Sequence, residues 1–291
     1  MDASIYARVK KLQIISKKMS RSGLMGDYAS AFKGLGLEFD QLRPYVPGDD
    51  VRSIDWNASA RNDETMVKTF IQERDRSIVV AVDASESLFY GSGSMLKYDF
   101  ACTVMSALGS IAVHSHDKFG TALFSSDVDL WMPPARGVGH FSRILSQASE
   151  VSGSGKRTSL DALFAFLLSL RNKRGVVVFV LSDWLDDQIF TSKNISAVAR
   201  YYDLIAVSIV DPRERMFLNR GALFMEDPES GKQYPVATSQ LTPRRVSELF
   251  FKRKDDFLRK KGVSHLTLEV GDGWVASLAR FFKERTRRQI S

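Results

Sequence analysis

A regular alternation of short apolar runs with helical stretches is the feature that most constrains this sequence. The first run, Ile78 to Val82, is continuous and rich in β-branched residues, which is typical of a parallel strand buried on both faces, and it ends at Asp83. Further apolar runs are found at 119–124, 176–181, 204–210 and 265–270, and stretches of helical period near 97–114, 141–150, 159–170, 191–202, 243–261 and 274–288. The alternation predicts an α/β fold with a doubly wound, mostly parallel, Rossmann-like sheet.

Two segments predict additions to this sheet. Residues 129–132 follow the run at 119–124 too closely for a helical crossover, so we expect them to pair antiparallel as an edge strand. Two short runs at 222–225 and 233–236 flank a turn-like sequence, which predicts a β-hairpin insertion within about 211–242.

The first part of the chain has a different character. Residues 5–19 show the spacing of an amphipathic helix. Residues 20–63 lose this period and are rich in glycine and proline, which favours turns and short extended pieces draped over the main domain. The expected division is therefore 1–76 for the N-terminal helix and draped segment, and 77–291 for the α/β domain.

Composition limits the compartment and the ligands. The longest apolar runs are far shorter than the roughly 20 residues of a membrane-spanning helix. A single cysteine, Cys102, cannot form an internal disulfide, so we expect a cytoplasmic protein without a membrane span of its own. The net charge of +7 is spread along the chain with denser clusters at its two ends. Because no nucleic-acid-binding module accompanies it, we expect solvated basic helices and no nucleic acid partner.

Oxygen-bearing side chains gather where the predicted strands end. Asp83, Ser85 and Ser87 occupy alternate positions after the first buried strand, and in doubly wound sheets ligands bind at the carboxyl ends of the strands. Another long run ends at Asp183, and Thr158 precedes a predicted helix. Carboxylate and hydroxyl oxygens are hard donors that suit Mg²⁺, Mn²⁺ or Ca²⁺. These five residues therefore form a candidate divalent metal site, with Mg²⁺ as the expected ion.

The same five residues resemble the metal-ion-dependent adhesion site of von Willebrand factor A domains. That pattern is Asp-x-Ser-x-Ser on one loop, a threonine on a second and an aspartate on a third. The resemblance implies that the serines and the threonine touch the ion, that the aspartates act partly through water, and that an acidic side chain of a partner fills an open position. One departure is Glu86, which adds a negative charge beside the site and is placed to compete for a binding position.

A second resemblance lies further upstream. The stretch FDQLRPYVPGDDVRSIDW at 39–56, followed by Ala60 and Arg61, resembles the signature of the family called domain of unknown function 58. That family couples the signature to a von Willebrand A-like fold. Its members are often encoded beside MoxR-type AAA+ ATPases, so the resemblance implies an accessory or adaptor in the chaperone-like assembly or maturation of other proteins.

Charged residues of this signature allow two interpretations. We expect Arg43, Asp49, Arg52 and Asp55 to form a structural ion-pair network, with Trp56 as its apolar anchor, that fastens the segment onto the main domain. The alternative is a second metal or catalytic cluster.

The leading hypothesis for function is a non-catalytic, metal-dependent interaction module. Its partner would be a MoxR-type AAA+ ATPase or the client protein of that ATPase. An alternative is a metal-dependent hydrolase of phosphoesters, in which Asp83 and Asp183 hold Mg²⁺ and orient a water. That reaction needs a base, for which Glu86, Asp186 and Asp187 are the candidates. A further alternative is a scaffold domain without a bound metal.

Overall fold

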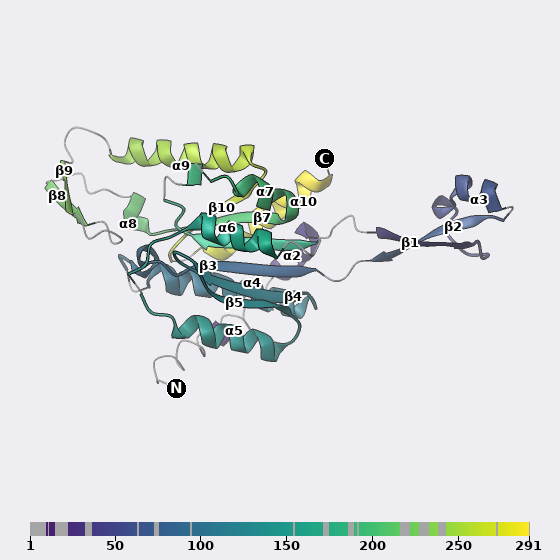
Figure 1. The fold of residues 1–291 in the computed structure, drawn as a ribbon, viewed down its shortest axis with the longest axis horizontal. Coiled ribbons are helices and arrows are strands. Elements are labelled where there is room, and N and C mark those ends of the chain that lie inside the picture. Colours follow the sequence, from purple (N-terminus) through teal and green to yellow (C-terminus); the bar gives the residue numbers. More distant parts are fainter. Residues whose placement is uncertain are drawn as a thin grey trace. The chain divides into compact units, whose positions relative to one another are not determined.

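The computed structural model describes residues 10, 12–14, 23–32, 37–62, 64–72, 76–93, 95–153, 155–170, 175–185, 189–190, 192–215, 222–226, 233–237, 243–271 and 273–290. The chain divides into two compact units, which Figure 1 shows with their elements labelled. The larger unit joins residues 1–31 with 76–291, and the smaller unit is 32–75. The start of the second large segment lies close to the expected boundary at 76, but the residues up to 31 group with the α/β unit.

The larger unit contains a six-stranded sheet in the order β10-β7-β6-β3-β4-β5. Its strands are β3 (Ser77–Asp83), β4 (Lys118–Phe124), β5 (Val128–Ala135), β6 (Val176–Ser182), β7 (Asp203–Val210) and β10 (Ser264–Glu269). Neighbouring strands are parallel except that β5 pairs antiparallel with β4 at one edge, as the short connection predicted. The predicted α/β fold with a doubly wound, mostly parallel sheet is confirmed.

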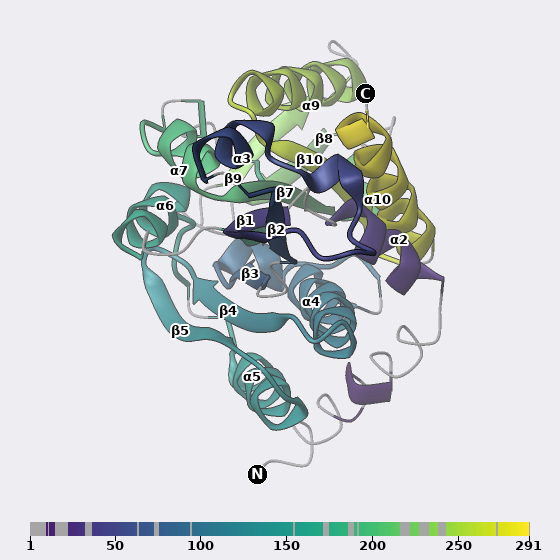
Figure 2. The ribbon, with the colours of Figure 1, turned by 90° about the vertical axis from the view of Figure 1, so that its right-hand side faces the viewer.

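Helices cover both faces of this sheet, as Figure 2 shows. One face carries α4 (Lys97–His114), α5 (Val138–Glu150) and α10 (Trp274–Ile290), and the other carries α6 (Leu160–Ser169), α7 (Ile195–Tyr201) and α9 (Pro243–Lys260). Every residue of β3 and β6 is consequently buried, which explains why both strands are continuous apolar runs. Short helical turns η2 (Glu86–Phe89) and α8 (Pro212–Arg215) follow β3 and β7.

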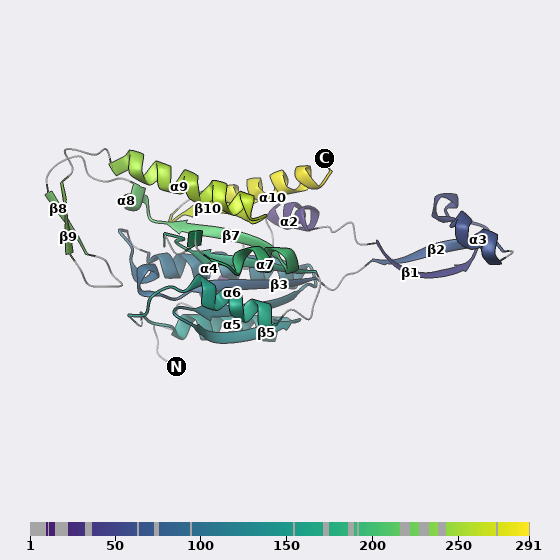
Figure 3. The same ribbon diagram turned by 45° about the horizontal axis from the view of Figure 1, so that its top comes forward.

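An antiparallel pair follows α8 in the chain. Strands β8 (Ala222–Glu226) and β9 (Gln233–Ala237) pair along their whole length, from Ala222 opposite Ala237 to Glu226 opposite Gln233. Figure 3 labels this pair, which follows α8 and precedes α9 in the chain. The structure therefore has a β-hairpin where the two apolar runs predicted one.

The N-terminal region contains a helix that the sequence did not predict. Helix α2 (Leu24–Ala31) packs on α10, and the ring of Tyr28 meets that of Phe282 edge to face at 5.8 Å. The expectation of turns was wrong here because burial of Leu24 and Tyr28 outweighs the low helix propensity of Gly26. Most of the helix predicted at 5–19 lies outside the described residues.

The smaller unit is a two-stranded sheet with helical turns between its strands. Strand β1 (Leu37–Pro44) pairs antiparallel with β2 (Met66–Gln72), and η1 (Val51–Ser53) and α3 (Trp56–Asn62) connect them. Here too the expectation of turns and extended pieces missed a helix, α3.

Ion pairs form inside this smaller unit. The Arg43 guanidinium donates to both carboxylate oxygens of Asp49, each at 2.7 Å, and Lys68 pairs with Asp55 at 3.1 Å. Asp50 caps η1 by accepting from the backbone N–H of Arg52. The prediction that Trp56 is the apolar anchor was wrong, because Trp56 begins the short helix α3 and its side chain is 71% exposed.

Candidate metal centre

The candidate site lies at the point where the strand order reverses. From β3 the chain first adds β4 and β5 on one side, and it later returns to place β6 on the other side. Such a switch point is where ligands bind in doubly wound sheets, outside the carboxyl ends of the strands. Val82 lies opposite Leu181 in the parallel register, so the next residues, Asp83 and Ser182, leave their strands side by side.

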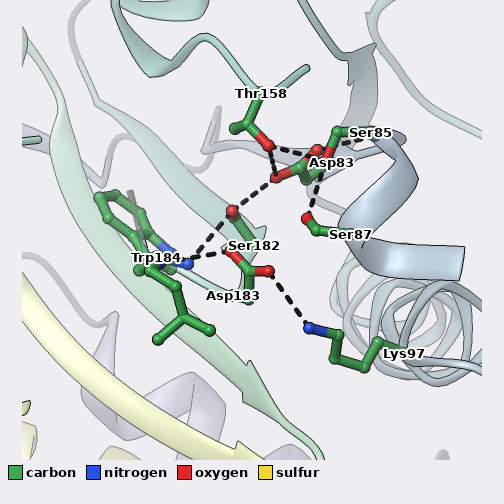
Figure 4. A network of polar contacts seen from close by, with 9 residues as sticks. Asp83, Ser85, Ser87, Lys97, Thr158, Ser182, Asp183 and Trp184 are labelled. Carbon is green, nitrogen blue, oxygen red and sulfur yellow. Dashed lines mark hydrogen bonds and ion pairs between the residues drawn. The ribbon is translucent and has the colours of Figure 1, made fainter. Parts of the chain in front are cut away.

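Asp83 is the centre of the polar network drawn in Figure 4. Its Oδ1 accepts the backbone N–H of Ser85 at 2.9 Å, and its Oδ2 accepts the Ser182 hydroxyl at 2.6 Å. The Thr158 hydroxyl approaches the same Oδ2 at 3.3 Å. The carboxylate has no solvent exposure, so these donors replace the water that it loses on folding.

The three predicted hydroxyl ligands form a continuous chain of oxygens. Thr158 Oγ1 lies 2.7 Å from Ser85 Oγ, which lies 3.1 Å from Ser87 Oγ. Adjacent ligands in an octahedral Mg²⁺ site are roughly 2.9 Å apart, given metal–oxygen distances of about 2.1 Å. Oxygens from two separate loops therefore already have the spacing that a small hard cation requires.

Asp183 completes the predicted set and brings a residue that the sequence analysis missed. Its Oδ1 accepts the backbone N–H of Leu185 at 3.3 Å, and its Oδ2 faces the Lys97 ammonium at 3.2 Å. Lys97 begins α4 and is only 2% exposed. A lysine in the first turn of a helix normally lies in solvent, so its sequence position carried no signal of this role.

Glu86 was expected to compete for a binding position, but its carboxylate is engaged elsewhere. Its Oε2 accepts the backbone N–H of Gly155 at 2.8 Å, and its own N–H donates to the carbonyl of Lys156 at 3.0 Å. A side chain at Gly153 would lie 3.1 Å from the same Oε2, so that glycine leaves room for the carboxylate. Glu86 thus fastens η2 to the loop that carries Thr158.

Electrostatics at the centre favour a cation. Burial raises the pKa of Asp83 to about 7, the neighbouring charge of Asp183 adds to the rise, and the hydrogen bonds from Ser182 and Ser85 oppose it. A charged Asp83 is thus costly without a counter-ion, and a divalent cation beside it would offset that cost.

The donor set fits a hard divalent ion. It contains two carboxylates and three hydroxyls and no nitrogen or sulfur ligand, which suits Mg²⁺ or Mn²⁺ better than zinc. In the part of the chain that the structure describes, no three His, Cys, Asp or Glu residues gather as a metal site. Asp186 and Asp187, which the hydrolase hypothesis names, lie outside that part.

Comparison with known proteins places the chain in a family. Residues 41–254 match the family described as protein of unknown function DUF58. The chain belongs to this family. Uncharacterized proteins of Mycobacterium bovis and Mycobacterium tuberculosis are 26% identical over 296 residues, covering 100% of this DUF58 protein and 92% of each relative. An uncharacterized protein of Mycobacterium avium is 27% identical over 141 residues, covering 47% of this chain and 82% of the relative.

Solved structures give more distant similarities. BatB from Bacteroides thetaiotaomicron has a TM-score of 0.46 at 12% identity, covering 73% of this chain and 99% of that chain. The SpRpn10 VWA domain has a TM-score of 0.41 at 10% identity, covering 70% and 93%. The strand order and the loop Asp83-x-Ser85-x-Ser87 agree with the von Willebrand factor A-like fold that the resemblance of this DUF58 protein implies. Within its described residues, no helix is both long and apolar enough to cross a membrane.

Proposed function

We propose that this DUF58 protein is a non-catalytic, cytoplasmic interaction module that binds a divalent ion, Mg²⁺ foremost, and uses the ion to dock a partner protein. The observation that carries the proposal is the convergence of Asp83, Ser85, Ser87, Thr158 and Asp183 at one switch point. Two serines and a threonine supply neutral oxygens, so the ion keeps positive charge that an acidic side chain of the partner can satisfy.

The partner that we propose is a MoxR-type AAA+ ATPase or its client, as the family resemblance implies. The hydrolase alternative receives less support from the described residues, because Glu86 is held by the backbone of the 153–158 loop rather than directed at a bound water. A scaffold without metal remains the competing interpretation of the same network, since Lys97 already neutralises part of its charge.

The first test is thermal unfolding with and without Mg²⁺ or Mn²⁺. A ligand that binds only the folded state stabilises it by about 2.7 kcal/mol at a hundredfold excess over Kd, which amounts to several degrees in Tm. We expect this shift in the wild type and in Asp256→Asn, a control that alters an exposed carboxylate paired with Arg259 on α9. Asp83→Asn should lose the shift, and an equal response of Asp83→Asn would contradict the site.

The second test is a pull-down of a MoxR-type AAA+ ATPase from the same organism, with and without EDTA. Wild type should capture the ATPase only when the ion is present, and a Ser85→Ala, Ser87→Ala double variant should fail to capture it. Phosphatase, nuclease and ATPase assays of the same preparations address the hydrolase. Turnover that disappears in Asp83→Asn would favour the hydrolase over the interaction module.

A further inference from the structure

Lys97 is a fixed cation in the wall of the candidate centre. Fifteen of the eighteen residues of α4 are buried, and Lys97 is one of them. Its backbone N–H donates to the carbonyl of Tyr90 at 2.9 Å, and its ammonium lies 3.2 Å from Asp183 Oδ2. Lysines are rarely buried to this degree unless they are paired, so the charge is held at this place by the fold.

The pairing with Lys97 also restrains Asp183. Each carboxylate oxygen has a donor, the Lys97 ammonium on Oδ2 and the Leu185 N–H on Oδ1. An aspartate held at both oxygens keeps one orientation, and part of its charge is already neutralised. Lys97 is therefore a positioning residue for Asp183 as well as a charge.

The net charge of the loaded centre depends on Lys97. Two ionised aspartates, as metal ligands must be, contribute two negative charges, and a divalent ion contributes two positive ones. Asp83 and Asp183 alone would balance the charge of the ion, whereas Lys97 adds one positive charge to the centre. The charge of Lys97 also lowers the pKa of Asp211, a buried carboxyl outside the ligand set that offsets part of the field of the lysine. A carboxylate from a partner balances the charge that Lys97 adds. Without Lys97 the same carboxylate would leave an uncompensated negative charge, which is costly in a partly buried site.

We propose that Lys97 determines the ligand specificity of the centre by adding one positive charge to the metal-loaded site, which selects an anionic partner oxygen. This inference rests on the proposed function, because it concerns the site after the ion has bound. It predicts opposite effects on two affinities when the lysine is neutralised. The ion should bind more tightly, because a like charge has gone, and the carboxylate should bind more weakly.

Mn²⁺ and acetate are suitable probes. The water-proton relaxation rate during a titration with Mn²⁺ measures the affinity for the ion. The decrease of this rate on adding acetate measures how well a carboxylate replaces a water on the bound ion. In Lys97→Met we expect about tenfold tighter Mn²⁺ binding and about tenfold weaker acetate binding, given the reach of an unscreened charge over a few ångströms. A loss of structure would instead weaken both affinities.

Two further variants keep the test decisive. Lys97→Gln retains a donor for Asp183 without the charge, and it carries the same expectation should Lys97→Met fail to fold. Lys97→Met combined with Asp183→Asn restores the net charge of the wild-type centre, so acetate affinity should return towards that of wild type. If folded Lys97 variants bind both probes as the wild type does, or bind both more weakly, the proposed role of Lys97 is overturned. The proposed function would be unaffected by that result. A wild type that binds no Mn²⁺ would overturn the proposed function together with this inference.

Discussion

At the scale of single residues, the candidate centre is organised around a carboxylate that has lost all contact with solvent. Asp83 is stabilised by a backbone N–H, a hydroxyl from the neighbouring strand and a more distant threonine. The strongest of these by distance is the 2.6 Å bond from Ser182. Hydrogen bonds to charged acceptors contribute more than neutral ones, so Ser182 has a measurable share in folding stability.

Replacement of Ser182 by alanine tests this share. We expect Ser182→Ala to lower the free energy of unfolding of the metal-free protein by about 1.5–3 kcal/mol, because the buried carboxylate loses a charge-assisted hydrogen bond. Urea unfolding measures the change. Ser169→Ala is a matched control, since its hydroxyl donates to the Phe166 carbonyl on an exposed helix surface. Equal effects of the two substitutions would contradict the importance of the bond to Asp83.

A second buried carboxylate, Asp117, has a pH-dependent role. Burial raises its pKa above the ordinary value of 3.8, although Arg76 and Tyr28 oppose the rise. The folded state therefore holds the proton more tightly than the unfolded state, and the stability from this site is present at low pH and lost as the pH rises through the raised pKa.

Comparison with Asp117→Asn isolates this titration. The difference in Tm, wild type minus variant, should decrease as the pH is raised from about 3 to about 7. Tyr28→Phe keeps the aromatic packing but removes a hydrogen bond that lowers the pKa, so the decrease should move to higher pH. A Tm difference that is constant over this range would contradict the assignment.

At the scale of elements, what could be predicted followed from strand ends. The buried run ending at Asp83 and the run ending at Asp183 were both recognisable, and parallel strands necessarily bring their carboxyl ends to one edge. Thr158 needed the family pattern, because nothing local distinguishes it from a helix cap. Ser182 and Lys97 escaped notice because their roles depend on register and on the burial of α4, which are tertiary properties.

Glu86 links two elements of the site, and its role can be tested. Glu86→Ala should raise amide hydrogen exchange in residues 153–158, because the Gly155 N–H loses its acceptor. Affinity for Mn²⁺ should fall as Thr158 loses its fixed position. Lys118→Ala, at the opposite end of the sheet, is the control and should change neither property. Unchanged exchange at the Gly155 amide in Glu86→Ala would contradict the role of Glu86 in holding this loop.

Another polar network fastens α9 to β7 and β10. Ser208 Oγ lies 2.9 Å from His265 Nε2, and His265 Nδ1 lies 2.8 Å from Asp255. These are the residue types of a serine hydrolase triad. However, Lys254 also donates to Ser208, and both Lys254 and Ser208 have no solvent exposure. A substrate has no access to that hydroxyl, so the network is structural.

Two measurements distinguish these roles of Ser208. A fluorophosphonate probe should not label the native protein, whereas it should label a serine hydrolase run in parallel. Ser208→Ala should lower the free energy of unfolding by about 1–3 kcal/mol, because buried polar groups lose a partner. Labelling of the wild type that is absent in Ser208→Ala would show a reactive nucleophile instead.

At the scale of the whole molecule, the family signature and the candidate centre belong to different units. Ion pairs of the signature, Arg43 with Asp49 and Asp55 with Lys68, close within residues 32–75. The two segments that flank the smaller unit, which end at residue 31 and begin at residue 76, both belong to the larger unit. Asp117 accepts the Tyr28 hydroxyl at 2.9 Å and pairs with Arg76 at 3.4 Å, so one carboxylate joins the two flanking segments.

This shared contact predicts that the smaller unit can be removed without unfolding the larger one. Residues 32–75 would be replaced by about six glycine and serine residues, which span roughly 14 Å on average. The closeness of the two ends at Asp117 makes such a connection short, and the six-stranded sheet, its helices and all five candidate ligands remain. We expect a cooperative unfolding transition and the same Mg²⁺-induced rise in Tm as in the full chain.

Because capture of the ATPase can depend on either unit, the pull-down with the shortened protein then assigns docking to one of them. A shortened protein that folds but no longer responds to Mg²⁺ would mean that the signature unit contributes to the metal centre, against the separation of the two units.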